Sequence, residues 1–118
     1  STPRRVLSAK TAALINDILS DNDSRAPIFG SRSILFFENY QVAAKTGTTQ
    51  SYRDGWTIGY TPSIAIGVWT GNNDNTPTRK EPGIVFAGPI FHQIMEKVLS
   101  SRGIPPGTPE LFLKSDSF

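Results

Sequence analysis

The sequence contains no cysteine and only one histidine. The absence of cysteine excludes disulfide bonds, thiolate catalysis and cysteine-ligated metal sites. The net charge is only +2 at pH 7, and no stripe of basic side chains is interleaved with aromatic ones, so we expect no nucleic-acid partner. No apolar stretch approaches the roughly 18 residues that span a bilayer. No charged-then-apolar signal sequence opens the chain, so we expect any membrane anchor to lie outside this segment.

The sequence also offers no set of metal ligands. His92 lies on a predicted helix and has no second ligand at metal spacing. The run Asn72-Asn73-Asp74-Asn75 has the composition of a calcium loop, but the bidentate glutamate of such loops does not follow at the required distance. We therefore interpret this run as a turn and expect neither a metal nor another cofactor.

A length of 118 residues with 37% hydrophobic content allows one modest core, in one domain or part of one. Apolar residues at helical spacing after a Ser8 cap predict an amphipathic helix over 8–20 that buries one stripe. Residues 22–33 form a polar segment with one proline and one glycine, which we interpret as a loop. The apolar run 34–37 is either a short strand or a linker.

Three segments of strand-like composition follow, at 42–49, 55–61 and 64–71. We expect them to form an antiparallel sheet flanked by helices, a fold of the α/β (α+β) class, with the last two strands joined as a hairpin. Large and small side chains alternate along these two strands, which indicates helices close to both faces. Trp56 and Trp69 are interpreted as packing residues, and Arg53-Asp54 as a structural ion pair or turn lock rather than a catalytic pair.

A second helix is predicted over 89–101, because proline suits the first helical position and Pro89 follows a glycine. Its predicted apolar stripe consists of Ile90, Phe91, Ile94, Met95 and Val98. Residues 105–118 are expected to be a loosely ordered tail. The folded part is then the segment 1–104.

The most informative motif is Lys45-Thr46-Gly47-Thr48-Thr49, which follows an apolar run. A lysine on a strand, beside a glycine that lets another backbone approach, can hold an anionic substrate along an open sheet edge. The motif therefore points to acyl-transfer chemistry on a peptide carboxylate. Lys-Thr-Gly is one signature of penicillin-binding proteins and serine β-lactamases.

The stretch from Ala44 to Asn75 closely resembles the corresponding part of class A (bifunctional) penicillin-binding proteins, whose C-terminal domain cross-links peptidoglycan. The resemblance extends upstream to Ser8 and downstream to about Val98, roughly three quarters of the chain. It implies that the chain is the C-terminal part of a transpeptidase domain. The matching residues after the motif are Arg53-Asp54, Trp56, Gly59-Tyr60-Thr61-Pro62 and Val68-Trp69-Thr70-Gly71-Asn72.

The resemblance also implies roles for the motif residues. Lys45 would supply positive charge near the nucleophile and the terminal carboxylate of the substrate, and the Thr46 hydroxyl would donate a hydrogen bond to that carboxylate. Gly47 would leave room for an extended substrate. The backbone N–H of Thr48 would be one of two oxyanion-hole donors. Thr49 could contact the substrate backbone.

The nucleophile of that family is missing from this chain. The family supplies it as Ser-x-x-Lys on the first turn of a helix, and no Ser-x-x-Lys occurs in the sequence. Ser20-Asp21-Asn22 matches a further family signature. However, only 22 residues separate Asn22 from Lys45, and short polar residues commonly end a helix. We interpret the triplet as a helix end, so the catalytic set is incomplete in this chain.

The sequence therefore predicts the C-terminal portion of a peptidoglycan DD-transpeptidase, inactive alone and carrying one wall of the site. Its expected partners are a stem peptide or β-lactam and the remainder of the transpeptidase domain, with an extracytoplasmic location implied by the family. Two alternatives remain at this point. One is a non-catalytic binding or assembly fragment, and the other is a remnant related to serine β-lactamases, which the similarity beyond Lys-Thr-Gly disfavours.

Overall fold

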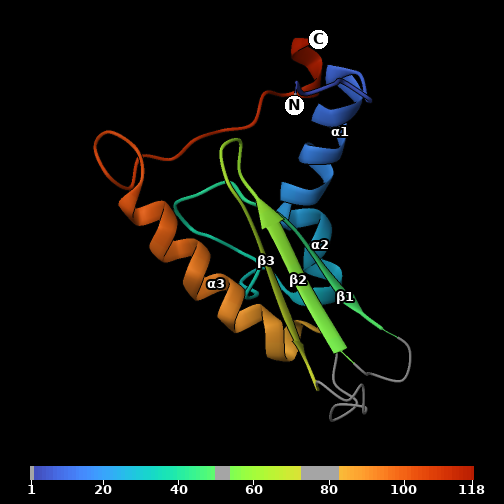
Figure 1. Cartoon of the computed structure of the whole chain (residues 1–118), viewed down its shortest axis with the longest axis vertical. Coiled ribbons are helices and arrows are strands. Elements are labelled where there is room, and N and C mark those ends of the chain that lie inside the picture. Colours follow the sequence, from blue (N-terminus) through green and yellow to red (C-terminus); the bar gives the residue numbers. More distant parts are fainter. Residues whose placement is uncertain (1, 50–53, 73–82) are drawn as a thin grey trace.

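The centre of the molecule is a three-stranded antiparallel sheet in the order β1-β2-β3 (Figure 1). A computed structural model describes residues 2–49, 54–72 and 83–118. The strands are β1 Ala43–Thr48, β2 Asp54–Tyr60 and β3 Ala65–Gly71. The Thr61 N–H donates to the Ile64 carbonyl at 2.8 Å and closes the β2–β3 hairpin. The predicted fold class, an antiparallel sheet with helices, is confirmed.

Helix α3, Gly83–Ser101, covers one face of the sheet (Figure 1). Its buried stripe repeats every four residues, the spacing that lines up one helix face. The members of the stripe are Ala87, Phe91, Met95 and Leu99. Gly59 of β2 permits the close approach, because a Cβ at this position would lie 2.3 Å from the Phe91 ring. The core therefore lies between α3 and the sheet.

The predicted start of this helix at residue 89 is wrong, since α3 begins at Gly83 and contains Pro89. The buried stripe begins at Ala87, ahead of the proline, so packing against the sheet holds the helix where the local signal predicts a start. Ile90 and Ile94, expected in the buried stripe, are 45% and 43% exposed. The buried face of α3 is therefore rotated away from them.

The segment 22–33 was predicted as a loop, but it contains helix α2, Asn22–Phe29. The Asp21 carboxylate caps this helix, accepting from the Asp23 N–H at 3.1 Å and the Ser24 hydroxyl at 2.6 Å. The Arg25 guanidinium donates to the backbone carbonyls that precede and follow the helix. Gly30 is the C-cap residue at a φ of 83°. Capping and the arginine brace together outweigh the loop signals of the sequence.

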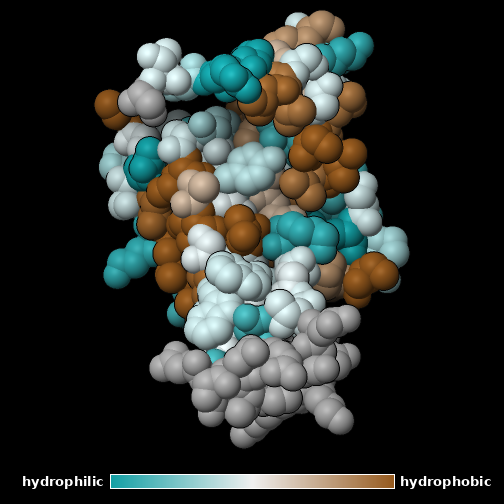
Figure 2. All heavy atoms as spheres, turned by 45° about the vertical axis from the view of Figure 1, so that its right-hand side comes forward, coloured by the Kyte–Doolittle hydropathy of each residue, from teal (hydrophilic) through white to brown (hydrophobic). Residues whose placement is uncertain are grey.

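Helix α1, Ala9–Ser20, has Ser8 as its N-cap, and the Ser8 hydroxyl oxygen accepts from the Thr11 N–H at 3.1 Å. Its apolar stripe was expected to be buried, but Ala13 is the buried residue of the helix. Leu14, Ile15 and Ile18 are 44%, 45% and 62% exposed. Hydrophobic side chains are accordingly visible on the surface in Figure 2. None of the described helices is long and apolar enough to cross a membrane.

The run 34–37 contains turns and no strand in the structure, so it is a linker. Leu35 and Phe37 insert into the core, where the Phe37 ring meets the Phe91 ring edge-on at 6.1 Å between centroids. The linker therefore supplies core side chains without adding to the sheet.

The C-terminal segment 105–118 was expected to be loosely ordered, but it makes defined contacts in the structure. The Glu110 carboxylate accepts from the hydroxyls of Thr61 and Ser63 at the β2–β3 turn. The Phe112 ring meets the Tyr60 ring edge-on at 5.6 Å. The segment then runs to α1, so that the chain ends lie near each other (Figure 1). We call residues 105–118 the C-terminal strap.

Candidate functional site

The Lys-Thr-Gly motif lies on β1, an edge strand that pairs with β2. The Thr49 N–H donates to the Asp54 carbonyl at 3.1 Å, so Thr49 and Asp54 are a hydrogen-bonded pair of the antiparallel ladder. Bonded and non-bonded pairs alternate in an antiparallel ladder. The backbone groups of Lys45 and Gly47 therefore face β2, whereas those of Thr46 and Thr48 face the outer edge. The motif thus presents alternate backbone groups along one border of the sheet.

Side chains of the motif alternate between the two sheet faces. Lys45 and Gly47 pair with Ile58 and Trp56 and share their face, which is opposite α3. Thr46 projects towards the α3 face. The Lys45 ammonium donates to the Thr46 carbonyl at 2.8 Å. Because that carbonyl faces outward, the ammonium lies at the outer edge of β1.

Nothing within the described part of the chain requires glycine at position 47. A Cβ there would meet only the Trp56 Cβ among the described atoms, at an ordinary 3.8 Å. The backbone of Gly47 is also outside the left-handed region, since the positive φ angles among described glycines are at Gly30, Gly103 and Gly107. The described residues therefore leave the space over Gly47 open to an approaching ligand or polypeptide.

The face around Gly47 is apolar and uncovered. Trp56 and Trp69 are cross-strand partners in the β2–β3 register and remain 42% and 41% exposed, while Ile58 beside them is 49% exposed. Both tryptophans, interpreted as packing residues, are therefore only partly buried in this chain. Helices are expected against both sheet faces. On this face α1 contacts the end of the sheet near Tyr60, where the Tyr60 hydroxyl donates to the Asn16 side chain at 2.5 Å. The expectation therefore holds only in part.

Asp54 joins the end of β1 to the other strands. Its carboxylate accepts hydrogen bonds from the Thr49 hydroxyl and from the Trp69 indole N–H, the latter at 2.8 Å. These two bonds, that from Thr49 first, lower the pKa of the Asp54 carboxyl below its ordinary value of 3.8. Arg53, the other half of the predicted ion pair, lies outside the described residues. Asp54 itself acts as the lock of the β1 end.

Ser20-Asp21-Asn22 forms the junction of α1 and α2. The Ser20 hydroxyl donates to the Asn16 carbonyl at 2.6 Å, and Asp21 is both the last cap of α1 and the first cap of α2. The Asn22 amide donates to the Ser31 carbonyl at 2.6 Å. These bonds are those of a helix end, in agreement with the structural interpretation of the triplet.

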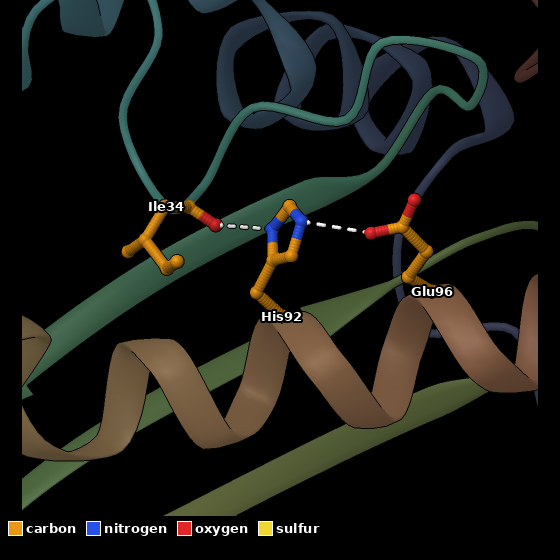
Figure 3. Close-up of polar contacts among 3 residues, drawn as sticks. All are labelled: Ile34, His92 and Glu96. Atoms are coloured by element: carbon orange, nitrogen blue, oxygen red, sulfur yellow. Dashed lines mark hydrogen bonds and ion pairs between the residues drawn. The ribbon is translucent and has the colours of Figure 1, made fainter.

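His92 lies on α3, where its ring stacks on the Phe37 ring at 4.3 Å between centroids. Its two ring nitrogens face acceptors on either side, with Nδ1 at 2.7 Å from the Ile34 carbonyl oxygen and Nε2 at 3.0 Å from the Glu96 carboxylate (Figure 3). His92 thus joins the 34–37 linker to the helix. Within the described ranges, no three histidine, cysteine or carboxylate side chains gather as a metal site; residues 73–75 of the calcium-like run lie outside those ranges.

The chain is similar to known proteins over most of its length. Residues 1–96 match the family described as the penicillin binding protein transpeptidase domain. The chain is 32% identical over 106 residues to penicillin-binding protein 1C of Escherichia coli, which covers 90% of this chain and 13% of the relative. It is 32% identical over 109 residues to penicillin-binding protein 1A of Pseudomonas aeruginosa, covering 87% of this chain and 13% of the relative.

A higher identity, 53% over 91 residues, relates it to penicillin-binding protein 1A of Aquifex aeolicus, covering 70% of this chain and 12% of the relative. The chain therefore spans only 12–13% of the length of these three relatives. No solved structure matches it.

Proposed function

The chain belongs to the penicillin-binding protein transpeptidase domain family, and we propose that it contributes the Lys-Thr-Gly side of a peptidoglycan DD-transpeptidase site. The family assignment agrees with the resemblance to class A penicillin-binding proteins drawn from the sequence. The proposed function goes beyond it, because the chain has no Ser-x-x-Lys nucleophile. In this proposal the nucleophile belongs to another segment, and the chain alone turns over no substrate.

The observation that carries the proposal is the open space over Gly47 on an edge strand. Neither its φ angle nor any described neighbour demands glycine there, whereas close approach of a ligand over this sheet face would favour it. Adding a strand to an exposed edge is a general mode of peptide recognition, in which backbone hydrogen bonds give affinity. The outward-facing backbone of Thr46 and Thr48 supports this mode.

We assign the residue roles along this edge as follows. The Lys45 ammonium attracts the terminal carboxylate of a stem peptide, and the Thr46 hydroxyl donates to it. The Thr48 N–H donates to the oxyanion that forms during acyl transfer, where loss of one such donor typically slows the reaction about a hundredfold or more. The Thr49 hydroxyl donates to Asp54, so any substrate contact of Thr49 uses its remaining atoms.

The complete site would perform acyl transfer in two steps. A serine oxygen attacks the carbonyl of the D-Ala-D-Ala amide, the C–N bond breaks, and D-alanine leaves with the proton. An amine of a second stem peptide then attacks the acyl ester and releases the serine. A β-lactam would acylate the same serine. Peptidoglycan as substrate implies an extracytoplasmic location for the chain.

A titration of the ¹⁵N-labelled chain with acetyl-Lys-D-Ala-D-Ala tests the carboxylate-binding part of the proposal. We expect amide shifts along β1 and at the facing residues of β2. The matched ligand is the same peptide with an amidated C-terminus, which removes the charge and keeps the backbone. Because an exposed ion pair contributes about 0–1 kcal/mol, Lys45→Gln should weaken binding by at most about fivefold.

Equal binding of the acid and the amide would remove Lys45 from the carboxylate role. Binding of both without any contribution from Lys45 would favour a non-catalytic fragment that uses the β1 edge only to bind extended peptides. Shifts confined to other elements would exclude the β1 edge as the site.

A further inference from the structure

One carboxylate connects all three strands of the sheet. Asp54 begins β2, and its side chain accepts from the hydroxyl of Thr49, which follows β1, and from the indole N–H of Trp69 on β3, at 2.8 Å for the indole. Two further bonds, both donated by backbone N–H groups, tie Thr49 to Asp54. The Thr49 N–H donates to the Asp54 carbonyl at 3.1 Å, and the Asp54 N–H donates to the Thr49 hydroxyl oxygen at 3.1 Å.

The position of the Trp69 ring is part of the same arrangement. A Cβ added at Gly71 would lie 2.6 Å from the Trp69 ring and 2.8 Å from the Asp54 Cβ. The indole therefore occupies the space that a side chain at position 71 would fill, and from there it reaches Asp54. We call Thr49, Asp54, Trp69 and Gly71 the Asp54 clamp.

The clamp adjoins the proposed site. Thr49 directly follows Thr48, whose backbone faces the outer edge, and the Thr49 N–H is the last described bond between β1 and β2 on that side. An edge strand held from one side only is free to shift at its end unless other bonds fix it. The Asp54 clamp supplies those bonds without using the groups that face outward.

We propose that Asp54 is a positioning residue that fixes the end of β1, and with it the Thr48 N–H, for ligands bound along the Lys45–Thr49 edge. Thr49 then acts by holding this end of the strand. The proposal deepens the function proposed above and rests on it. It concerns geometry, so it is open to test by backbone exchange as well as by ligand affinity.

The test measures amide hydrogen exchange at residue 49, whose N–H donates to the Asp54 carbonyl, the indole N–H resonance of Trp69 and the affinity for acetyl-Lys-D-Ala-D-Ala on the 118-residue chain. The variants are Asp54→Ala, Thr49→Val and Trp69→Phe. Thr49→Ser is the matched rescue, because it keeps the hydroxyl that valine removes. Asp116→Asn, which deletes an exposed carboxylate elsewhere, controls for the change in charge.

We expect Asp54→Ala and Thr49→Val to speed amide exchange at residue 49 and to weaken peptide binding about three- to tenfold, the effect of losing roughly one ordinary hydrogen bond. Trp69→Phe should produce the same changes to a smaller extent. Thr49→Ser should keep wild-type exchange and affinity while its urea midpoint equals that of Thr49→Val. A difference between two variants of equal stability would not be explained by a general loss of stability. If Asp54→Ala fails to fold, Asp54→Asn and the Thr49 pair carry the test.

Wild-type amide exchange at residue 49 and wild-type affinity in both Asp54→Ala and Thr49→Val would overturn the clamp. A wild-type chain that binds no peptide would contradict the proposed function instead. The clamp would then be supported if Asp54→Ala and Thr49→Val speed amide exchange at residue 49 and Asp54→Ala moves the Trp69 resonance, and overturned if they do not.

Discussion

At the scale of single residues, a substitution at Gly47 should affect ligand binding and stability in different ways. Replacing a strand glycine by alanine without strain raises stability by up to about 1 kcal/mol, mostly through the unfolded chain. The space over Gly47 fits a Cβ, so Gly47→Ala should leave the urea midpoint unchanged or raise it. We expect the same variant to weaken peptide binding at least threefold, because the added methyl fills space over the sheet face that a closely approaching ligand would use.

Gly67→Ala is the matched control for this prediction. Gly67 lies on β3, and a Cβ there would meet only Ile58 among described atoms, at 3.6 Å. It should therefore have a similar effect on stability and none on binding. Equal affinity of the Gly47→Ala and wild-type chains would contradict a ligand over Gly47.

Thr57 gives a second test at this scale. The residue is fully buried against α3, and its hydroxyl has no hydrogen-bond partner among the described residues. An unsatisfied buried hydroxyl destabilises a fold by about 1–3 kcal/mol. Thr57→Val keeps the shape and should raise the free energy of unfolding by about 1 kcal/mol. Thr57→Ala, which also removes the methyl group, should not raise the free energy of unfolding.

Urea denaturation of both variants provides the measurement. A loss of more than 1 kcal/mol in Thr57→Val would show that the hydroxyl has a partner in solution, since a satisfied buried hydroxyl costs about that much to remove.

Residue by residue, the sequence predicted the Lys45 edge but not the Asp54 clamp. A motif of five consecutive residues on a strand carries its own geometry, because alternation decides which groups face outward. The clamp joins Thr49, Asp54 and Trp69 through the strand register. Its one sequence signal was the Arg53-Asp54 turn lock, which does not identify the partners.

At the scale of elements, the C-terminal strap depends on Glu110. Hydrogen bonds from Thr61 and then Ser63 lower the pKa of this carboxyl below its ordinary value of 4.5. A carboxyl with a depressed pKa in the folded state stabilises that state above the ordinary value and loses this contribution as pH falls through the depressed value. We therefore expect the strap to loosen from the hairpin only below pH 4.5.

Amide shifts of Ser63 and Phe112 between pH 6 and pH 2.5 would follow this release. Glu110→Gln should abolish the transition at both residues, and Asp116→Asn should leave it intact. A transition that persists in Glu110→Gln would assign the pH dependence to another group.

The elements also show where sequence patterns mislead. Strand segments were placed within a few residues, because alternation and hairpin spacing are local properties. Helix α2 was missed because its stability comes from the Asp21 cap and from Arg25, which reaches backbone carbonyls on both sides of the helix. The start of α3 was misplaced because packing at Ala87 overrides the preference of Pro89 for a first helical turn.

At the scale of the whole molecule, exposed apolar surface is the main departure from the pattern of a self-contained domain. The sheet face with Trp56, Ile58 and Trp69 and the α1 residues Ile15 and Ile18 are 41–62% exposed. Patterning predicted burial for the α1 stripe, because it cannot distinguish a stripe that packs within the chain from one that packs elsewhere. The proposed nucleophile-bearing segment would have to approach this same Lys45 face.

The central claim is that this chain supplies one side of a transpeptidase site and lacks the nucleophile. The most direct test is the intact mass of the chain after incubation with a fluorescent penicillin, alone and mixed with a recombinant segment that carries Ser-x-x-Lys. We predict no adduct on this chain in either sample, and acylation of the partner segment that requires the chain and falls in Lys45→Gln. A covalent adduct on this chain alone, or labelling of the partner that is indifferent to it, would contradict the account.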